Sequence, residues 1–322
     1  MTSETSVLVG LEDVRAAAER LRGVVERTPL LHSETLSEEV GAEVRLKCES
    51  LQRAGAFKIR GAYNFLSKLS TEELQRGVIT YSSGNHAQAV ALAARLLGTR
   101  AVVVMPITAP AIKRTGAARL GAEVILEGTT SLERRDRALQ IQAEQDLTMV
   151  PPFDHPDIIA GQGTVGLEIV EEWPDVDVVL VCVGGGGLAS GCGVSLRALK
   201  PEATLYAVEP TGAAALRAAL DAGEPVTLPR IDTIADGLAP VRAGDLTFRH
   251  IRALYDDVVL VEDHEIRAAA SVLLTRVKLV VEFSGAAGVA ALRSGRLPLA
   301  GRRVAVVLSG GNLDPSLLSQ LS

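Results

Sequence analysis

The chain has 322 residues, of which 47% are hydrophobic, and a formal net charge of −6. This length allows one large or two modest domains with a substantial core. An acidic chain without a basic tract is not expected to have nucleic acid or an anionic membrane as its main partner. No run approaches the ~20 apolar residues of a membrane span. The N-terminus lacks a secretory pattern and the three cysteines lack metal-ligand spacing, so we expect a cytoplasmic enzyme or binding protein with reduced thiols.

Apolar residues at helical spacing predict a helix from residue 11 to 25, which Pro29 ends because proline cannot continue a helix. An alternating run predicts a strand over 43–48. From there, short runs rich in Val and Ile alternate with alanine-rich amphipathic segments. The predicted strands are 78–82, 101–105, 122–126, 178–183, 204–208, 257–261 and 303–308, and the predicted helices are 86–97, 110–119, 131–145, 188–199 and 264–279.

Strands that are apolar on both faces and separated by helices predict an α/β fold with mostly parallel open sheets and helices on both faces. The strands form two groups, 78–126 and 178–308, separated by the proline-rich stretch VPPFDHP at 150–156. We expect this stretch to be a domain crossing. Ligands collect at the carboxyl ends of parallel strands, so the turns that follow the strands are the candidate binding segments.

The first such turn, SSGNH at 82–86, follows the strand VITYS. Its residues Ser82, Ser83 and Gly84 leave main-chain N–H groups free at the start of a helix, which suits a carboxylate or a phosphate. Asn85 and His86 would face the bound group. An ordinary serine N-cap is the alternative interpretation of this turn.

The second turn contains four successive glycines, Gly184, Gly185, Gly186 and Gly187, and precedes a predicted helix. Glycines allow the backbone to wrap an anion closely, which indicates a phosphate site. The same turn satisfies a loose dinucleotide pattern through Gly184, Gly186 and Ala189, with Glu209 ending a later strand, so a nicotinamide-binding protein remains an alternative. The third turn, SGGN at 309–312, offers the neutral hydroxyl of Ser309 to a ligand.

Lys58 lies in the stretch AGAFKIRGAYN, between Phe57 and Ile59. Apolar neighbours remove solvation from an ammonium group, so its pKa falls and the amine can form a Schiff base. Most lysines in such a setting extend to solvent instead. The three glycine turns further along the chain are what make Lys58 a candidate catalytic residue.

A lysine in AFKIRGAYN, an SSGNH turn, a four-glycine turn and a terminal SGGN turn, in this order, resemble the fold-type II pyridoxal-phosphate enzymes. Within that group they are similar to the serine/threonine dehydratase and serine racemase family, as are DIIAGQGTVGLEI at 157–169 and DGL at 236–238. The resemblance implies a tryptophan synthase β-like fold, with a large cofactor-binding domain of residues 1–68 and 151–322 and a small substrate-binding domain of residues 69–150. It also implies pyridoxal 5'-phosphate as cofactor and a homodimer.

Each motif position carries an implied role. Lys58 would bind the cofactor as a Schiff base and act as the base at Cα, and the other cofactor contacts would be Phe57 beside the ring, Asn85 at the ring hydroxyl, Gly184 to Gly187 at the phosphate and Ser309 at the pyridine nitrogen. The substrate carboxylate would be held by Ser82, Ser83, Gly84, Asn85 and His86. Ser83 would lie opposite Lys58 and be the second catalytic residue.

The implied reaction is the dehydration and deamination of L-threonine or L-serine to a 2-oxo acid and ammonia. Racemisation of serine is the nearest alternative, because a hydroxyl at Ser83 could return a proton on the opposite face. A β-replacement enzyme of the same fold, a nicotinamide dehydrogenase and a non-catalytic binding protein are the remaining alternatives.

Two departures from the family pattern affect these expectations. Racemase-like members hold a divalent cation with a glutamate and an aspartate six residues later, and here Glu209 is followed at that spacing by Ala215, so a metal is doubtful. The chain also ends soon after SGGN, so feedback inhibition through a C-terminal regulatory domain is not expected.

Substrate side-chain contacts are expected in 150–156 and 236–245, where Asp154 and His155 are open candidates and Arg242 is interpreted as a loop residue. Arg242 or Arg135 facing the site would favour a substrate with a polar β-substituent such as 3-hydroxyaspartate.

Overall fold

The computed structural model of the protein describes residues 8–82, 84–109 and 111–321. Its strands form two sheets. The larger has the order β1-β2-β10-β7-β8-β9, and the smaller has the order β5-β4-β3-β6. β1 runs antiparallel to β2 and all other pairs are parallel. The α/β class with mostly parallel sheets is thereby confirmed.

The bounds of the described strands follow the apolar runs of the sequence closely. They are β1 (Leu30–His32), β2 (Glu43–Lys47), β3 (Val78–Tyr81), β4 (Ala101–Met105), β5 (Glu123–Leu126), β6 (Thr148–Met149), β7 (Val178–Cys182), β8 (Thr204–Pro210), β9 (Asp257–Val261) and β10 (Arg303–Val307). The short strands β1 and β6 were not predicted, because two or three residues give too little periodicity to recognise.

The helices among the described residues are α1 (Leu11–Leu21), α2 (Glu34–Val40), α3 (Lys58–Leu66), α4 (Thr71–Arg76), α5 (Asn85–Leu97), α6 (Ala111–Arg119), α7 (Ser131–Gln145), α8 (Pro156–Glu172), α9 (Gly187–Leu199), α10 (Ala215–Ala222), α11 (Asp245–Leu254), α12 (Asp263–Val272) and α13 (Phe283–Arg293). The predicted helix 11–25 ends earlier, at Leu21, and Gly23 then adopts a φ of 74°, a left-handed value that glycine tolerates. The predicted helix 264–279 consists of α12 and a π-helical turn, Leu273–Val277.

The smaller sheet is covered on both faces. Val102 and Val104 of β4 pack with Ile141 of α7, whereas Val103 and Met105 belong to the cluster that contains α5. Because side chains alternate along a strand, four successive buried residues need an apolar layer on each side. This arrangement leaves only the strand ends open to a ligand.

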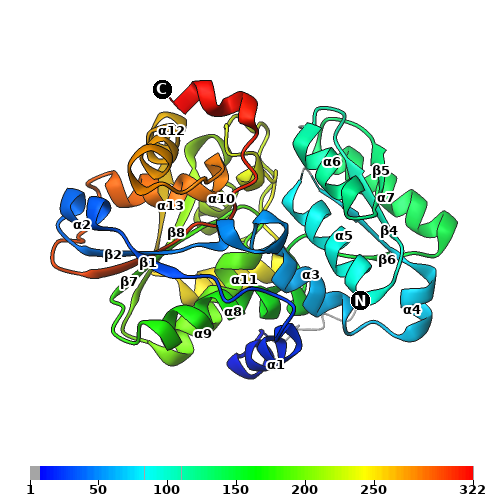
Figure 1. The fold of residues 1–322 in the computed structure, drawn as a ribbon, viewed down its shortest axis with the longest axis horizontal. Helices are drawn as coiled ribbons and strands as arrows, with labels where there is room; N and C mark the ends of the chain where they lie inside the picture. The colour runs from blue at the N-terminus through cyan, green and yellow to red at the C-terminus, as the bar shows by residue number, and fades with distance from the viewer. Residues whose placement is uncertain (1–7, 83, 110, 322) are drawn as a thin grey trace.

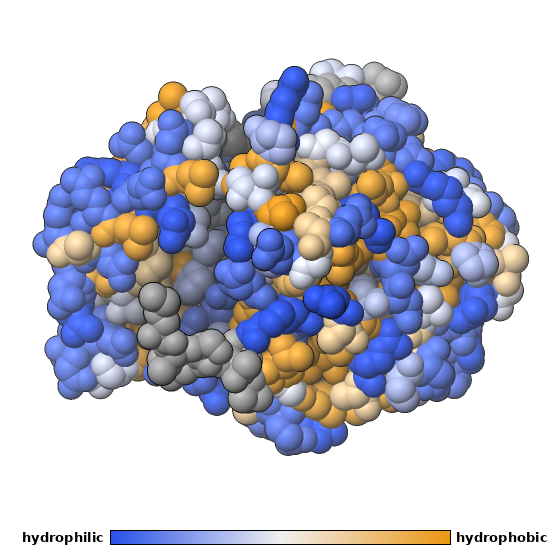
Figure 2. Space-filling model, turned by 180° about the vertical axis from the view of Figure 1, so that it is seen from behind, coloured by the Kyte–Doolittle hydropathy of each residue, from blue (hydrophilic) through white to orange (hydrophobic). Residues whose placement is uncertain are grey.

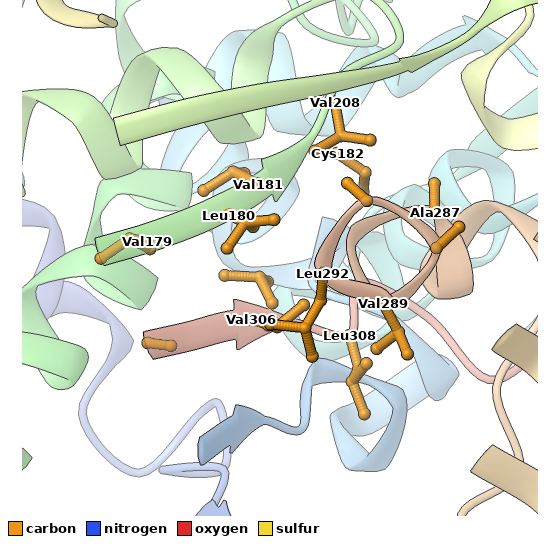
Figure 3. Packing of buried hydrophobic residues seen from close by; sticks show 14 of the residues in the cluster. Val179, Leu180, Val181, Cys182, Val208, Ala287, Val289, Leu292, Val306 and Leu308 are labelled. Atoms are coloured by element: carbon orange, nitrogen blue, oxygen red, sulfur yellow. The ribbon is translucent and has the colours of Figure 1, made fainter. Parts of the chain in front are cut away.

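The larger sheet has the same three-layer construction. Figure 3 shows the side chains of α13 beside those of β7 and β10, with Leu292 close to Val306 and Val289 close to Leu308. In Figure 1, α8 and α9 lie on one side of this sheet, α12 and α13 lie on the other, and the smaller sheet with α5 and α7 forms the second half of the molecule. No helix among the described residues is long and apolar enough to cross a membrane.

Candidate active site

A cavity of about 630 Å³ is lined by residues from both sheets. Tyr81 and Ser82 reach it from the end of β3, Cys182 from the end of β7, and Ser309 from the turn after β10. The three strands meet here because all of them point their carboxyl ends toward the same region, as parallel sheets do at their ligand sites. In the view from behind, a recess separates the smaller half of the surface from the larger half (Figure 2).

Lys58 is the first residue of α3, and it lines the cavity. The backbone before it is fixed to the turn after β10: the N–H of Phe57 donates to the carbonyl oxygen of Ser309 at 3.1 Å, and Ala56 forms an isolated bridge with Gly310. Lys58 Nζ donates to the carbonyl oxygen of Pro152 at 2.8 Å and lies 5.1 Å from the centre of the Phe57 ring.

The surroundings of Lys58 disfavour its charged form. It makes no ion pair with any residue that the structure describes, and desolvation by the neighbouring protein lowers the pKa of the amine from 10.5 to about 8. At pH 7 about a tenth of the population is therefore the free amine, the form that attacks a carbonyl group, and this fraction is far larger than for an ordinary lysine.

The four-glycine turn, between β7 and α9, also lines the cavity. Gly186 has a φ of 95°, and α9 begins at Gly187. A Cβ at Gly185 would lie only 2.1 Å from Cδ1 of Phe153, and one at Gly184 would lie 2.9 Å from the carbonyl oxygen of Gly237. Larger residues do not fit here. The first N–H groups of α9 have no partner within the helix, so this cradle suits a phosphate.

The turn after β3 orders the start of α5. The N–H of Gly84 donates to Ser82 Oγ at 3.2 Å, and Asn85 is the first helical residue. The Asn85 side chain donates from Nδ2 to a carboxylate oxygen of Glu282 and accepts at Oδ1 from Asn312 Nδ2 at 2.9 Å. Ser83, the predicted second catalytic residue, lies outside the described residues.

His86 is buried beneath this turn, with 2% of its surface exposed. Its Nε2 lies 3.4 Å from the carbonyl oxygen of Val150, and Nδ1 has no partner among the described residues. Desolvation, with the charge of Lys58 as a second cause, lowers the pKa of His86 from 6.5 to about 3. The imidazole is therefore neutral, and the contact to Val150 requires the proton to be on Nε2.

A second polar group of the cavity was missed by the sequence interpretation. Lys113 of α6 donates from Nζ to Asp236 at 2.5 Å and lies 3.4 Å from Glu282 Oε2. Glu282 is 3% exposed, and desolvation raises the pKa of its carboxyl. A Cβ at Gly84 would lie 2.3 Å from Cδ of Lys113. Lys113, Asp236 and Glu282 thus link α6, beside the smaller sheet, to the larger half of the molecule. The three residues lie far apart in the sequence, so no local sequence pattern predicts their contact.

Ser309 is 4% exposed, and its Oγ accepts from the thiol of Cys182 at 3.3 Å. Burial raises the pKa of Cys182 to about 11, so the thiol is neutral. Cys182 is buried and also lines the cavity. A ligand at Ser309 therefore meets a neutral hydroxyl, and the thiol of Cys182 behind it is neutral as well.

A buried charge cluster lies directly behind Lys58. Arg60 of α3 binds Glu49 and Glu168, with Nε 2.8 Å from Glu49 Oε2 and Nη1 2.6 Å from Glu168 Oε1. Lys47 Nζ donates to Glu168 at 2.6 Å and to the carbonyl oxygen of Thr28, also at 2.6 Å. Two positive and two negative side chains balance each other, and they hold the first turn of α3 against α8 and β2.

Glu209 lies near the end of β8 and is completely buried. Its carboxylate oxygens accept from the N–H groups of Leu216 at 2.8 Å and Arg217 at 2.9 Å, and desolvation raises its pKa to about 7. The carboxylate therefore caps the start of α10. Across the described residues, no group of three His, Cys, Asp or Glu side chains is arranged to hold a metal ion.

The side chains that were considered as substrate contacts mostly bond to other parts of the protein. Asp154 does not offer its carboxylate to a ligand, because its oxygens accept from three N–H groups at the start of α11 at 3.0 Å. His155 caps α8 through Asp157. Arg242 pairs with Asp245 at 2.7 Å in a loop, as expected. Arg135 is exposed, and its neighbour Arg134 lines the cavity instead.

The chain is similar to known proteins of one family. The family model for a pyridoxal-phosphate dependent enzyme matches residues 21–310. An L-threonine ammonia-lyase of Thermotoga maritima is 46% identical over 98% of this chain and 78% of its own length. An L-threo-3-hydroxyaspartate ammonia-lyase of a Pseudomonas species is 41% identical over 95% of this chain and 96% of its own.

A solved structure of maize serine racemase has a TM-score of 0.93 and 38% identity, covering 98% of this chain and 97% of its own. The match of the family model to most of the chain, together with relatives of this identity over nearly the full length, shows the family. The chain belongs to the pyridoxal-phosphate dependent enzymes of fold type II, in the family of threonine dehydratases and serine racemases.

Proposed function

We propose that the protein eliminates water from a β-hydroxy amino acid, L-threonine or L-serine, and that hydrolysis of the resulting enamine takes up one water and gives a 2-oxo acid and ammonia. The observation that carries this proposal is the position of Lys58, an amine with a lowered pKa in a cavity between a glycine cradle and a neutral hydroxyl. The activity named for the Thermotoga relative is in accord with it.

The cavity fits the cofactor of the family. Pyridoxal phosphate, when bound, accepts electron density from Cα of an amino acid and so makes its proton acidic. Lys58 would hold this group covalently, Phe57 would lie beside its ring, and Ser309 would face its pyridine nitrogen. Asn85 would bind the ring hydroxyl. The residues at the phosphate would be Gly184, Gly185, Gly186 and Gly187, where a Cβ would fill the space.

The side chains around the substrate have distinct tasks. Lys58, released by the substrate amine, would take the proton from Cα, and a pKa near 8 suits a base at neutral pH. The turn Ser82, Ser83, Gly84, Asn85 and His86 would bind the substrate carboxylate through the N–H groups at the start of α5. His86, being neutral, would add no charge there.

Ser309 would favour elimination over transamination. A carboxylate in its place would keep the pyridine nitrogen protonated and draw more charge into the ring. Neither Ser309 nor the neutral thiol of Cys182 does so. Restricting this delocalisation favours prompt departure of the β-hydroxyl.

Racemisation is the second candidate function, since serine racemases are among the relatives. It requires a proton donor on the face opposite Lys58, the role that we assign to Ser83. The two functions share one site, and they differ in whether the recovered substrate contains the other enantiomer.

We further propose that residues 69–150 form the small substrate-binding domain, that residues 1–68 and 151–322 form the large one, and that the protein is a cytoplasmic homodimer. Strands β3 to β6, which make the smaller sheet, all lie within 69–150.

The exposed residues Leu51 and Val280 are candidates for the dimer contact, because the backbone beside each of them lies next to Gly311. A divalent cation stays doubtful, because helix amides already bind both oxygens of Glu209.

The test is a comparison of the purified holoenzyme with Lys58→Ala, using L-threonine and L-serine and detecting the 2-oxo acid. We expect Lys58→Ala to lose the visible absorption of the bound cofactor and at least ~10³-fold in turnover. Lys68→Ala is the matched control, because Lys68 is an exposed lysine two residues after the end of α3 that pairs with Asp157. Absence of oxo acid with the wild-type protein, or full turnover in Lys58→Ala, would contradict the proposal.

A further inference from the structure

The cavity contains a buried carboxylate that the proposed reaction does not use. Glu282 directly precedes α13 and lines the cavity, with 3% of its surface exposed. Its Oε1 accepts from Asn85 Nδ2, whereas its Oε2 has no hydrogen-bond donor among the described residues. Lys113 Nζ lies 3.4 Å from this Oε2 and is the only cation of the described chain within ion-pair distance of it. Because an uncompensated buried charge is costly, a charged Glu282 depends on Lys113.

Lys113 reaches Glu282 from the other half of the molecule. It is 5% exposed and, with Ala117, forms the buried part of α6. Its Nζ also donates to Asp236 Oδ2 at 2.5 Å. Burial lowers the pKa of Lys113, but the carboxylates of Glu282 and Asp236 raise it by more, so the net direction is upward. The ammonium group is therefore charged at neutral pH.

The charge state of Glu282 is finely balanced. Desolvation raises the pKa of its carboxyl, Lys113 opposes this change, Asp236 adds to it, and the hydrogen bond from Asn85 opposes it. The other titratable groups on this side are Lys58, which forms no ion pair with the described residues, and the neutral thiol of Cys182. Without Lys113, Glu282 would take up a proton far more readily.

The orientation of the Asn85 amide depends on this charge state. Asn312 Nδ2 donates to the carbonyl oxygen of Ala54 and to Asn85 Oδ1, both at 2.9 Å. A main-chain carbonyl can only accept, so it fixes which end of the Asn312 amide donates. Asn85 must then accept through Oδ1 and donate through Nδ2. A carboxylate at Glu282 can only accept and fits this pattern, whereas a protonated carboxyl can also donate and removes the constraint.

We propose that Glu282 and Lys113 are positioning residues for the cofactor: Lys113 holds Glu282 as a carboxylate, and the carboxylate turns the second Nδ2 proton of Asn85 toward the ring hydroxyl. This inference rests on the proposed function, since it requires pyridoxal phosphate in the cavity with Asn85 at its ring. Both residues act through Asn85. Their loss should therefore appear in the affinity for the cofactor, before any substrate is added.

The experiment is a fluorescence titration of the apoenzyme with pyridoxal phosphate at several pH values between about 6.5 and 9.5. We expect Glu282→Gln to raise the Kd roughly 10- to 100-fold at each pH, the loss expected for a hydrogen bond to a charged group. Lys113→Met should raise it by a similar factor at the lowest pH. This factor should shrink as the pH rises, because Glu282 then loses its proton without help. In the double variant, Lys113→Met should add nothing to Glu282→Gln.

Asp236→Asn separates this role from a plain link between the two halves. Asp236 makes the shorter contact to Lys113, so its loss would weaken cofactor binding as much as Lys113→Met does if Lys113 only joined the halves. We expect the Kd of Asp236→Asn to change by less than about fivefold, because Asp236 is half-exposed and Lys113 stays beside Glu282. Glu262→Gln is the matched control, since Glu262 is exposed and precedes α12 as Glu282 precedes α13.

Thermal unfolding of each apoenzyme shows whether the variant is folded. Binding by Glu282→Gln as tight as that of the wild type would overturn the proposal, and this comparison decides it even where Lys113→Met does not fold. Additive losses in the double variant, or a factor for Lys113→Met that is the same at every pH, would show that Lys113 does not act through the charge of Glu282 and would overturn it as well. A wild-type protein that binds no pyridoxal phosphate would instead refute the proposed function.

Discussion

Asn312 donates a hydrogen bond to Asn85, with Nδ2 and Oδ1 2.9 Å apart. Asn85 begins α5 beside the smaller sheet, and Asn312 follows the last strand of the larger sheet, so the bond joins the two halves. Asn312 Nδ2 also donates to the carbonyl oxygen of Ala54 at 2.9 Å. With Oδ1 occupied and one proton of Nδ2 directed at Glu282, Asn85 has its second Nδ2 proton available for a ligand.

Replacement of Asn312 by leucine should therefore weaken cofactor binding. Each lost hydrogen bond costs about 0.5–1.5 kcal/mol, so loss of the two bonds of Asn312 should raise the Kd of the apoenzyme for pyridoxal phosphate by roughly 5- to 150-fold. The measurement is a fluorescence titration. Asp314→Asn, two residues later at an exposed turn, is the control and should bind normally. An unchanged Kd in Asn312→Leu would mean that Asn85 is oriented without Asn312.

Gly185→Ala should impair the phosphate cradle, because the new Cβ would lie 2.1 Å from the Phe153 ring. Crowding of this size typically costs about 1–3 kcal/mol, and here we expect it to appear as a cofactor Kd raised by roughly tenfold or more. The additional change Phe153→Ala removes the obstructing ring and should restore part of the affinity. Gly10→Ala, whose Cβ meets its nearest atom at 3.9 Å, is the matched control. Equal affinities of Gly185→Ala and wild type would refute the cradle.

The rate of cofactor uptake by the apoenzyme should follow the free-amine form of Lys58. Its pKa is lowered from 10.5 to about 8, so the reactive fraction reaches one half at about pH 8 and levels off about one pH unit above that. An ordinary lysine would give a rate that still rises above pH 9. Stopped-flow absorbance between pH 6 and 10 measures this dependence. A rate that keeps rising to pH 10 would show that Lys58 is solvated.

His86 should make the protein sensitive to acid. Its pKa is lowered to about 3 in the folded state, below the ordinary 6.5, so the unfolded chain binds the proton more readily between these values. The free energy of unfolding should therefore fall by up to about 1.4 kcal/mol per pH unit from this residue as the pH drops below 6.5. His86→Asn should show a smaller drop in Tm between pH 7 and 4 than the wild type. The exposed His264→Asn serves as the comparison and should behave as the wild type does.

The buried charge cluster predicts a large difference between two arginines. Arg60→Met leaves Glu49 without an ion-pair partner in the interior and leaves Glu168 paired with Lys47 alone, which typically costs about 3–5 kcal/mol. Arg27→Met removes an exposed pair with Glu171 and should cost no more than about 1 kcal/mol. Urea unfolding of the two variants measures the contrast. Similar stabilities would mean that the interior around Arg60 is hydrated or can rearrange.

Much of the fold could be predicted because each central strand is a short run of Val and Ile between clear turns. The site followed from the strand ends: Ser82, Gly184 and Ser309 lie far apart in sequence, and the rule for parallel sheets brings them together. The side chains that act across the cavity were not predicted. Lys113 and Glu282 are separated by 169 positions of otherwise ordinary sequence, and nothing local pairs them.

Helical spacing alone could have predicted that Arg134 lies on the buried face of α7. The sequence interpretation considered Arg135, one position away. Ala138 and Ile141 lie on the buried face of α7. Arg134 precedes Ala138 by four residues and therefore lies on the same face. In contrast, the cluster around Arg60 depends on Glu168, 108 residues later, and only the packing of α3 on α8 reveals it.

The order of strands in the larger sheet has a consequence for the synthesis of the protein. β10, the last of the described strands in chain order, lies between β2 and β7, and the N–H of Phe57 donates to the carbonyl oxygen of Ser309 in the turn that follows it. The nascent chain can complete the smaller sheet early, because β3 to β6 are consecutive. The segment that carries Lys58 gains its main-chain partner only after residue 309 has been added. Formation of the cofactor site therefore requires synthesis of the chain through β10 and the turn after it, and a truncation before β10 yields a chain without a formed binding site.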